Sequence, residues 1–131
     1  MKALILSAGQ GSRLLPMTED TPKCLLRLNA MSALEWQVRQ LHRCGVNDIT
    51  VVTGFQAEKV DAVLMRLRAA GINVRSLFNP FYKVADNLAS CWLARDEMDG
   101  DLIVLNGDTV FEDAVLEDVL ARAAHAINVT V

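Results

Sequence analysis

The sequence predicts an α/β fold in which helices cover both faces of a doubly wound, mostly parallel sheet. Short apolar runs alternate with amphipathic helical segments along the chain, as in successive βαβ units. Ala3–Leu6 and Leu102–Leu105 are continuously apolar, which is typical of central strands covered on both faces. A glycine-containing loop follows each of these two runs, so these loops are candidates for a binding site.

The composition favours one compact globular domain. The chain has 131 residues, of which 52% are hydrophobic and 22% charged. Apolar runs reach about five residues, whereas a membrane-spanning helix needs about 20. Lys2 leads directly into a strand, so we expect no secretory signal. A net charge of −3 argues against nucleic-acid binding. Three widely spaced cysteines are interpreted as reduced thiols, and we expect a cytoplasmic protein.

Strands and helices are expected to alternate in chain order. We expect strands over residues 2–6, 48–53, 72–77, 101–106 and 127–131. Helices are expected over residues 32–44, 56–70, 87–96 and 112–124. Ser32 and Glu35 form a capping-box pair at the start of the first helix. Gly71 stands where a glycine commonly follows the end of a helix. The second and last helices have apolar stripes at helical spacing, formed by Val60, Val63, Leu64 and Leu67 and by Val115, Leu116, Val119 and Leu120.

The expected connections predict a Rossmann-like strand order of 3-2-1-4. Right-handed crossovers favour this order, and the alternating polar and apolar residues at 72–75 suit an edge strand. The winding of the sheet reverses between strands one and four, and ligands bind beyond the carboxyl ends of strands at such a point. The glycine loop leaves strand one there, and Gly107–Asp108 leaves strand four there. The sequence therefore predicts that these two motifs share one site.

Residues 7–13, Ser-Ala-Gly-Gln-Gly-Ser-Arg, form the glycine loop. Small residues leave backbone N–H groups accessible, and Arg13 and Lys23 add two cations, which together suit a polyphosphate. A P-loop is excluded because no Gly-Lys-Ser/Thr ending follows Gly9. A dinucleotide-binding fingerprint is disfavoured because Leu14 replaces its third small residue and Pro16 opposes a helix starting in the loop.

The string from Leu6 to Leu14, with Pro16, Thr18 and Thr21-Pro22-Lys23, resembles the signature of the nucleoside-triphosphate transferase family. This family includes sugar-1-phosphate nucleotidyltransferases and the related phosphocholine cytidylyltransferases. The resemblance continues through residues 52–55, 79–80 and 87–90 and ends at 106–108, so it covers nearly the whole chain. It implies a GT-A-type nucleotidyltransferase fold. We expect residues 1–131 to be the N-terminal nucleotide-binding part of such a domain, truncated before the acceptor-binding remainder.

The resemblance implies a Mg²⁺-dependent transfer from an NTP to a phosphorylated small molecule, either a sugar-1-phosphate or a phosphocholine-like compound. The attacking phosphate oxygen is already ionised, so catalysis depends on positioning and charge neutralisation rather than on a general base. Arg13 is expected to clamp the β- and γ-phosphates, and Lys23 to contact the α-phosphate and the incoming phosphate. Asp108, at the end of an apolar strand, is the expected Mg²⁺ ligand. A second aspartate ligand, implied by the family, would lie beyond Val131.

Several further residues are expected to contact the nucleotide. They are Leu6, Ala8, Gly9, Gly11, Ser12, Gly54, Asn87, Leu88 and Gly107. Asn87 is equally well explained as a helix N-cap, and both roles stay open. The segment 87–92 is somewhat more similar to the phosphocholine and aminophosphonate cytidylyltransferase branch than to the sugar branch. A choline headgroup would suit the aromatic face of Trp92. However, Leu88, Cys91 and Trp92 share one helical face, so we expect Trp92 to pack in the core.

A different class of function stays open beside the enzyme. Some relatives in the family are regulatory subunits, so the chain is alternatively a catalytically silent module that senses a nucleotide or sugar nucleotide. The presence of Arg13, Lys23 and Asp108 together favours the enzyme, because a sensor need not keep all three. An open sheet edge would promote association, and a homo-oligomer is therefore among the expected states.

Overall fold

Within residues 1–130, which the computed structural model describes, a four-stranded parallel sheet forms the centre of the molecule. Its strands are β1 (Lys2–Leu6), β2 (Asp48–Thr53), β3 (Val74–Phe78) and β4 (Leu102–Asn106). Their order is β3-β2-β1-β4, so the predicted order is confirmed. In the register of the sheet, Leu6 lies beside Val52 on one side and Asn106 on the other. The carboxyl ends of β1 and β4 are therefore neighbours.

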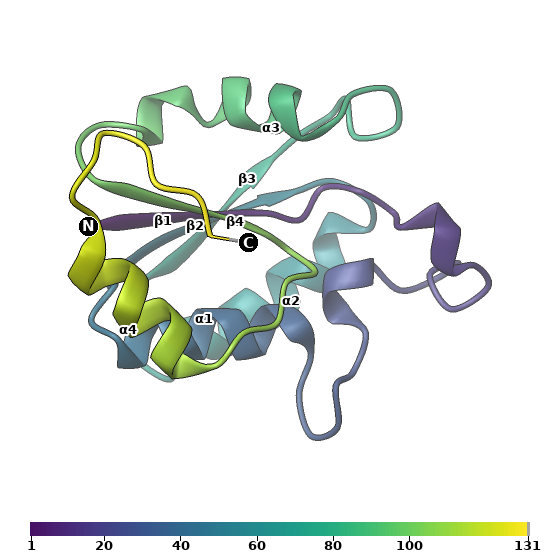
Figure 1. Cartoon of the computed structure of the whole chain (residues 1–131). Helices are drawn as coiled ribbons and strands as arrows, with labels where there is room; N and C mark the ends of the chain where they lie inside the picture. Colours follow the sequence, from purple (N-terminus) through teal and green to yellow (C-terminus); the bar gives the residue numbers. More distant parts are fainter. Residues whose placement is uncertain (131) are drawn as a thin grey trace.

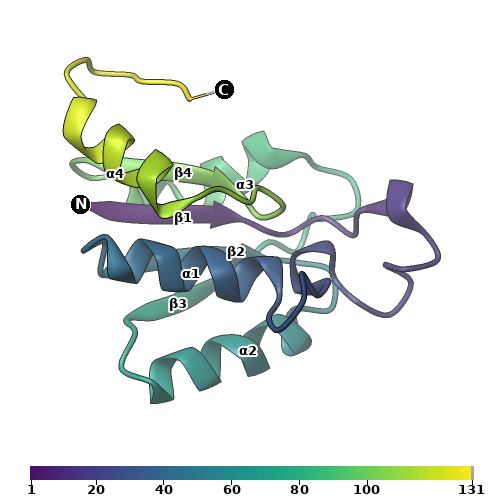
Figure 2. The same ribbon diagram turned by 60° about the horizontal axis from the view of Figure 1, so that its bottom comes forward.

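Helices cover both faces of the sheet, which confirms the doubly wound α/β class. Figure 1 shows α1 (Ala33–Arg43), α2 (Ala57–Ala69) and α4 (Asp113–Arg122) on one face and α3 (Asn87–Leu93) on the other. The turned view in Figure 2 shows α1 running beneath the central strands, with the long loop after β1 extending past their carboxyl ends. None of the described helices is long and apolar enough to cross a membrane.

Local sequence signals explain where the helices begin and end. The Ser32 hydroxyl accepts a hydrogen bond from the Glu35 backbone N–H at 3.2 Å, as the predicted cap requires. Gly71, just beyond α2, has a φ of 88°, in the left-handed region that glycine enters without steric cost. The expected helix boundaries are confirmed to within a few residues, and the expected helix at 87–96 is divided into α3 and a short 3₁₀ turn, Arg95–Glu97.

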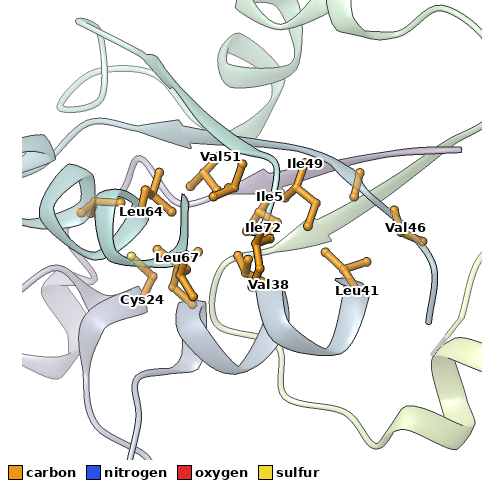
Figure 3. Packing of buried hydrophobic residues seen from close by; sticks show 14 of the residues in the cluster. Ile5, Cys24, Val38, Leu41, Val46, Ile49, Val51, Leu64, Leu67 and Ile72 are labelled. Atoms are coloured by element: carbon orange, nitrogen blue, oxygen red, sulfur yellow. The ribbon is translucent and has the colours of Figure 1, made fainter. Parts of the chain in front are cut away.

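The larger core lies between the sheet and the helices α1 and α2. Figure 3 shows Val38 and Leu41 of α1 with Ile5 of β1 and Leu64 of α2 in this cluster. These four side chains are fully buried. Burial of each such side chain stabilises the fold by about 1.5–3 kcal/mol. A smaller cluster on the α3 face contains Leu4, Leu6, Ala8, Val52 and Ala94.

Two expectations about strands are wrong. The expectation that β4 is a central strand is wrong, because β4 is the edge of the described sheet and its Val104 is 47% exposed. The expected strand 127–131 is not formed over residues 127–130, where Ile127 and Val129 are exposed; Val131 lies outside the described residues. β-branched residues favour a strand, but a strand also needs a neighbour for its hydrogen bonds.

Candidate functional site

The glycine loop is folded back on itself at the carboxyl end of β1. Gly11 has a φ of 74°, and its carbonyl oxygen accepts a 2.9 Å hydrogen bond from the hydroxyl of the fully buried Thr18. The aliphatic stem of Lys23 packs directly on Gly11, since a Cβ at Gly11 would lie 2.9 Å from the Lys23 Cβ. Gly11 is therefore needed both for its backbone conformation and for the close approach of Lys23.

Lys23 and Asp108 meet in a direct ion pair at this end of the sheet. Lys23 begins a 3₁₀ turn, Lys23–Leu25, and Asp108 lies in the turn that follows β4. The hydrogen bond from Lys23 is the main cause that lowers the pKa of Asp108, and the charge of Arg13 adds a smaller effect in the same direction. The fold thus brings Lys23 and Asp108 into contact and places Arg13 near enough for its charge to act on the carboxylate.

Gly107 allows the Asp108 turn to lie against β1. Its N–H donates to the Leu6 carbonyl oxygen at 2.8 Å, which continues the pairing of β1 and β4. A Cβ at Gly107 would lie 2.0 Å from Ser7 Oγ and 2.9 Å from the Leu6 carbonyl oxygen. No larger residue fits without moving one of the two strands. The predicted role of Gly107 in nucleotide binding stays a prediction, while its structural role is evident.

Gln37 of α1 holds the same turn from beneath and was not anticipated from the sequence. Its Nε2 donates to the carbonyl oxygens of Asn106 at 2.8 Å and Thr109 at 2.6 Å, on either side of Asp108. Gln37 is fully buried. It stands three residues after Leu34, in the helical stripe of Leu34, Val38 and Leu41. An amide at an apolar-stripe position was the signal that could have revealed it.

A second buried glutamine and a tryptophan hold the chain just beyond this turn. Gln40 Nε2 donates to the Phe111 carbonyl oxygen at 2.6 Å, and Trp36 Nε1 donates to the same oxygen at 3.2 Å. Three side chains of α1 therefore bind the backbone of residues 106–111. This segment, which carries Asp108, is anchored to a helix rather than free as an open loop.

The predicted nucleotide-binding positions Gly54 and Asn87 also lie at this edge of the sheet. A Cβ at Gly54 would lie 2.6 Å from the Ala8 carbonyl oxygen, and that oxygen accepts a 2.9 Å hydrogen bond from the Phe55 N–H. Asn87 Nδ2 donates to Asn106 Oδ1 at 3.0 Å. Asn87 is not the N-cap of α3, because Asp86 is, and the Asp86 carboxylate accepts a 2.9 Å hydrogen bond from the Leu88 N–H. Its side chain is thus directed towards the end of β4.

Trp92 does not pack in the core, contrary to the expectation. It is 66% exposed, and the Arg95 guanidinium lies 4.7 Å from its ring centroid. α3 instead buries the small Ser90, and Ala94 at its C-terminal end packs in the smaller cluster with β1, while Leu88 and Trp92 face solvent. Of the face that was expected to be core, Leu88 and Trp92 are therefore exposed, whereas Cys91 packs against the smaller cluster.

Asp108, the one carboxylate of the site among the described residues, suits a metal ion that arrives with phosphates. Within residues 1–130, no cluster of three or more His, Cys, Asp or Glu side chains could hold a metal by itself. Asp108 is a single carboxylate whose side chain is 44% exposed at the carboxyl edge of the sheet. Mg²⁺ is commonly bound by one or two carboxylates together with substrate phosphates and water. The single carboxylate fits such a shared site.

Comparison with known proteins identifies the family to which this chain belongs. The model of a family described as nucleotidyl transferase matches residues 2–131. The choline-phosphate cytidylyltransferase of Streptococcus pneumoniae is 34% identical over 95% of this chain and 52% of its own length. The CTP:phosphoglutamine cytidylyltransferase of Campylobacter jejuni is 30% identical over 98% of this chain and 52% of its own length. The chain thus spans about half the length of these two curated relatives.

Solved structures agree with the sequence comparison. The structure of CTP:phosphocholine cytidylyltransferase from Streptococcus pneumoniae superposes with a TM-score of 0.76 at 34% identity, covering 86% of this chain and 47% of that one. A nucleotidyl transferase from Methanothermobacter superposes with a TM-score of 0.72 at 26% identity, covering 92% of this chain and 56% of that one. The described sheet and helices therefore correspond to about half of each neighbour.

Proposed function

Because the chain belongs to the nucleotidyl transferase family, we propose that it forms the nucleotide-binding part of an enzyme that joins an NTP to a phosphorylated small molecule. The products would be an NDP-linked compound and pyrophosphate. The observation that carries this proposal is the contact of Lys23 with Asp108 at the point where the sheet reverses its winding, with Arg13 nearby. At that position, the two cations suit the negative triphosphate, and the carboxylate suits a metal ion bound to it.

The side chains of the site would act on the phosphates in different ways. The backbone N–H groups of the glycine loop and the guanidinium of Arg13 would bind the β- and γ-phosphates. Lys23 would leave Asp108 and contact the α-phosphate and the incoming phosphate, which brings two anions together. The attacking phosphate oxygen needs no base, so these residues would work by orienting the reactants and by neutralising charge.

Mg²⁺ is the proposed cofactor of the reaction. Asp108 would hold it together with phosphate oxygens, and the ion would supply charge neutralisation on the triphosphate. The support is the half-exposed Asp108 carboxylate, held at the end of β4 by the turn and by α1. Lys23 would release Asp108 when the nucleotide binds, which frees the carboxylate to hold the ion.

CTP is the nucleotide that we propose, with a phosphorylated alcohol of the phosphocholine type as the acceptor. Two relatives about one-third identical to this chain are named as cytidylyltransferases, one for choline phosphate and one for phosphoglutamine. Asn87, at the start of α3, binds Asn106 at the end of β4, and the exposed Leu88 and Trp92 lie on the same helix. An apolar and aromatic surface suits an alkylated ammonium group better than a sugar.

Binding and turnover measurements test the proposal in order. A thermal-shift series with CTP, UTP, dTTP, GTP and ATP, each with Mg²⁺, should show the largest stabilisation with CTP. Pyrophosphate release should then require CTP together with phosphocholine or a related acceptor, and a sugar-1-phosphate should serve poorly. Pyrophosphate release with a sugar-1-phosphate but not with phosphocholine would contradict the proposed acceptor. The release assay needs a chain that also carries the acceptor-binding remainder, and nucleotide binding by that chain without release from any pair would support a sensing module in place of the enzyme.

A further inference from the structure

We propose that Gln37 is a positioning residue for Asp108, holding the carboxylate in the orientation that a metal–nucleotide complex requires. The inference rests on the function proposed above, since it concerns the same site. Gln37 would not touch the substrate. It would act through the backbone of the turn that carries Asp108.

The turn is a four-residue unit with Asp108 near its tip. The Thr109 N–H donates to the Asn106 carbonyl oxygen at 3.1 Å, which closes the turn around Gly107 and Asp108. Gln37 Nε2 donates to that same oxygen and to the Thr109 carbonyl oxygen. One amide group thus binds the first and the last residue of the turn. Both carbonyls are held on the α1 side, while Asp108 faces Lys23.

The chemistry of these contacts leaves one orientation for the Gln37 amide. Both partners are carbonyl oxygens, so only the NH₂ end of the amide can satisfy them. The Oε1 atom is buried and has no hydrogen-bond partner among the described residues. A buried acceptor without a partner costs about 1–3 kcal/mol. An apolar residue of similar size would avoid that cost, so the glutamine is better explained by the two bonds that it makes than by packing.

Gln40 provides a matched comparison within the same helix. It is also fully buried, and its Oε1 likewise has no partner among the described residues. Its Nε2 binds the Phe111 carbonyl oxygen, three positions beyond Asp108 and outside the turn. Loss of Gln40 removes a buried amide and a backbone contact of the same kind as Gln37, but it leaves both ends of the Asp108 turn held. Loss of either glutamine should therefore lower the stability of the fold. Only loss of Gln37 should also change the orientation of the Asp108 carboxylate.

The decisive experiment compares Gln37→Met with Gln40→Met in the purified protein. The affinity for Mn²⁺ in the presence of CTP is measured by electron paramagnetic resonance, and the affinity for CTP alone by calorimetry in EDTA. Residues that hold a metal ligand in place without touching the metal typically contribute a factor of about 10–100 to metal affinity. We expect Gln37→Met to weaken Mn²⁺ binding by about that factor with metal-free CTP affinity unchanged. Gln40→Met should leave both affinities at the wild-type value. Equal Mn²⁺ affinities in Gln37→Met and wild type, or equal losses in both variants, would overturn the inference.

Hydrogen exchange on the wild-type protein supplies a second measurement that needs neither a variant nor a ligand. Thr109 is exposed, yet its N–H lies in the closed turn. If Gln37 holds this turn, the Thr109 amide exchanges slowly, whereas free exchange across residues 107–109 would contradict the inference. If the wild-type protein binds no CTP in the presence of Mn²⁺, the proposed function is contradicted, and so is the role of Gln37 in metal binding. The exchange result would still report separately whether the turn is held.

Discussion

Lys23 and Asp108 form an ion pair although 85 positions separate them in the chain. The pair exists because β1 and β4 are neighbours in the sheet, so the loops that leave their carboxyl ends meet. Both side chains stay partly exposed, at 31% for Lys23 and 44% for Asp108. An ion pair in contact with solvent contributes little to stability. Its significance lies in holding two opposite charges together where a ligand can reach both.

Replacement of Lys23 by methionine should reduce nucleotidyl transfer by about 10²–10³, because a cation that stabilises charge in the transition state is lost. Lys2→Met is the matched control, since Lys2 also pairs with an aspartate, Asp99, but at the amino end of β1. Steady-state pyrophosphate release measures both variants. Comparable rates for Lys23→Met and Lys2→Met would exclude a role for Lys23 in the reaction.

Arg13→Met should lower the rate by a similar factor of about 10²–10³, and Arg13→Lys should recover only part of it. A guanidinium binds phosphate oxygens in pairs, whereas an ammonium acts as a point charge. Arg122, which pairs with Asp118 within α4, serves as the control arginine. The assay is again pyrophosphate release at saturating CTP. Full activity in Arg13→Lys would show that only the charge matters, and full activity in Arg13→Met would remove Arg13 from the site.

Gly107→Ala should destabilise the protein by about 1–3 kcal/mol, because the added methyl group would overlap Ser7 and the β1 backbone. Gly9→Ala tests the opposite case, since a Cβ at Gly9 would meet no atom within 4 Å. We expect Gly9→Ala to unfold like the wild type and yet to bind CTP more weakly, as the methyl group would occupy space beside the loop N–H groups. Urea unfolding and calorimetry separate the two effects. A stable Gly107→Ala variant would contradict the close approach of the two strands.

The stability contributed by Asp108 should disappear in acid. Lys23 lowers the pKa of Asp108 in the folded protein below the ordinary value of 3.8. The folded state therefore binds this proton less tightly than the unfolded state, and the contribution is present above the ordinary pKa and lost as the pH falls through the folded one. The difference in unfolding free energy between wild type and Asp108→Asn should shrink below about pH 4. A difference that grows towards low pH would contradict this sign.

Cys24 should resist alkylation in the folded protein. All three cysteines lie in the described part of the chain and are free thiols. Burial raises the pKa of Cys24 from 9.0 to about 11, although the Ser7 hydroxyl beside it acts in the opposite direction. A two-unit shift leaves roughly 100-fold less thiolate at neutral pH, and the thiolate is the reactive form. In a variant that carries Cys44→Ser and Cys91→Ser, iodoacetamide should label Cys24 only after urea is added. Rapid labelling without urea would show that this thiol is accessible.

The sequence by itself determined the four strands of the described sheet, the helices that connect them and the strand order. The Ser32 cap of α1 and the Gly71 stop of α2 act through neighbouring residues, so local sequence was sufficient to predict them. The strand order followed because right-handed crossovers leave few topologies for four parallel strands. That order predicted the meeting of the glycine loop and Asp108. The family resemblance was likewise readable from the string that runs from Leu6 to Lys23 and from the later motifs, and it is confirmed over residues 2–131.

Only the tertiary structure decided how the site is supported and which surfaces are covered. The carbonyl partners of Gln37 lie 69 and 72 positions away, so no local pattern specifies its two hydrogen bonds. The shared face of Leu88 and Trp92 was visible in the sequence, but the small residues Ser90 and Ala94 are the ones that are buried. A local pattern tells which side chains share a face of a helix. Whether that face is buried depends on the element that packs against it, which is a property of the whole fold.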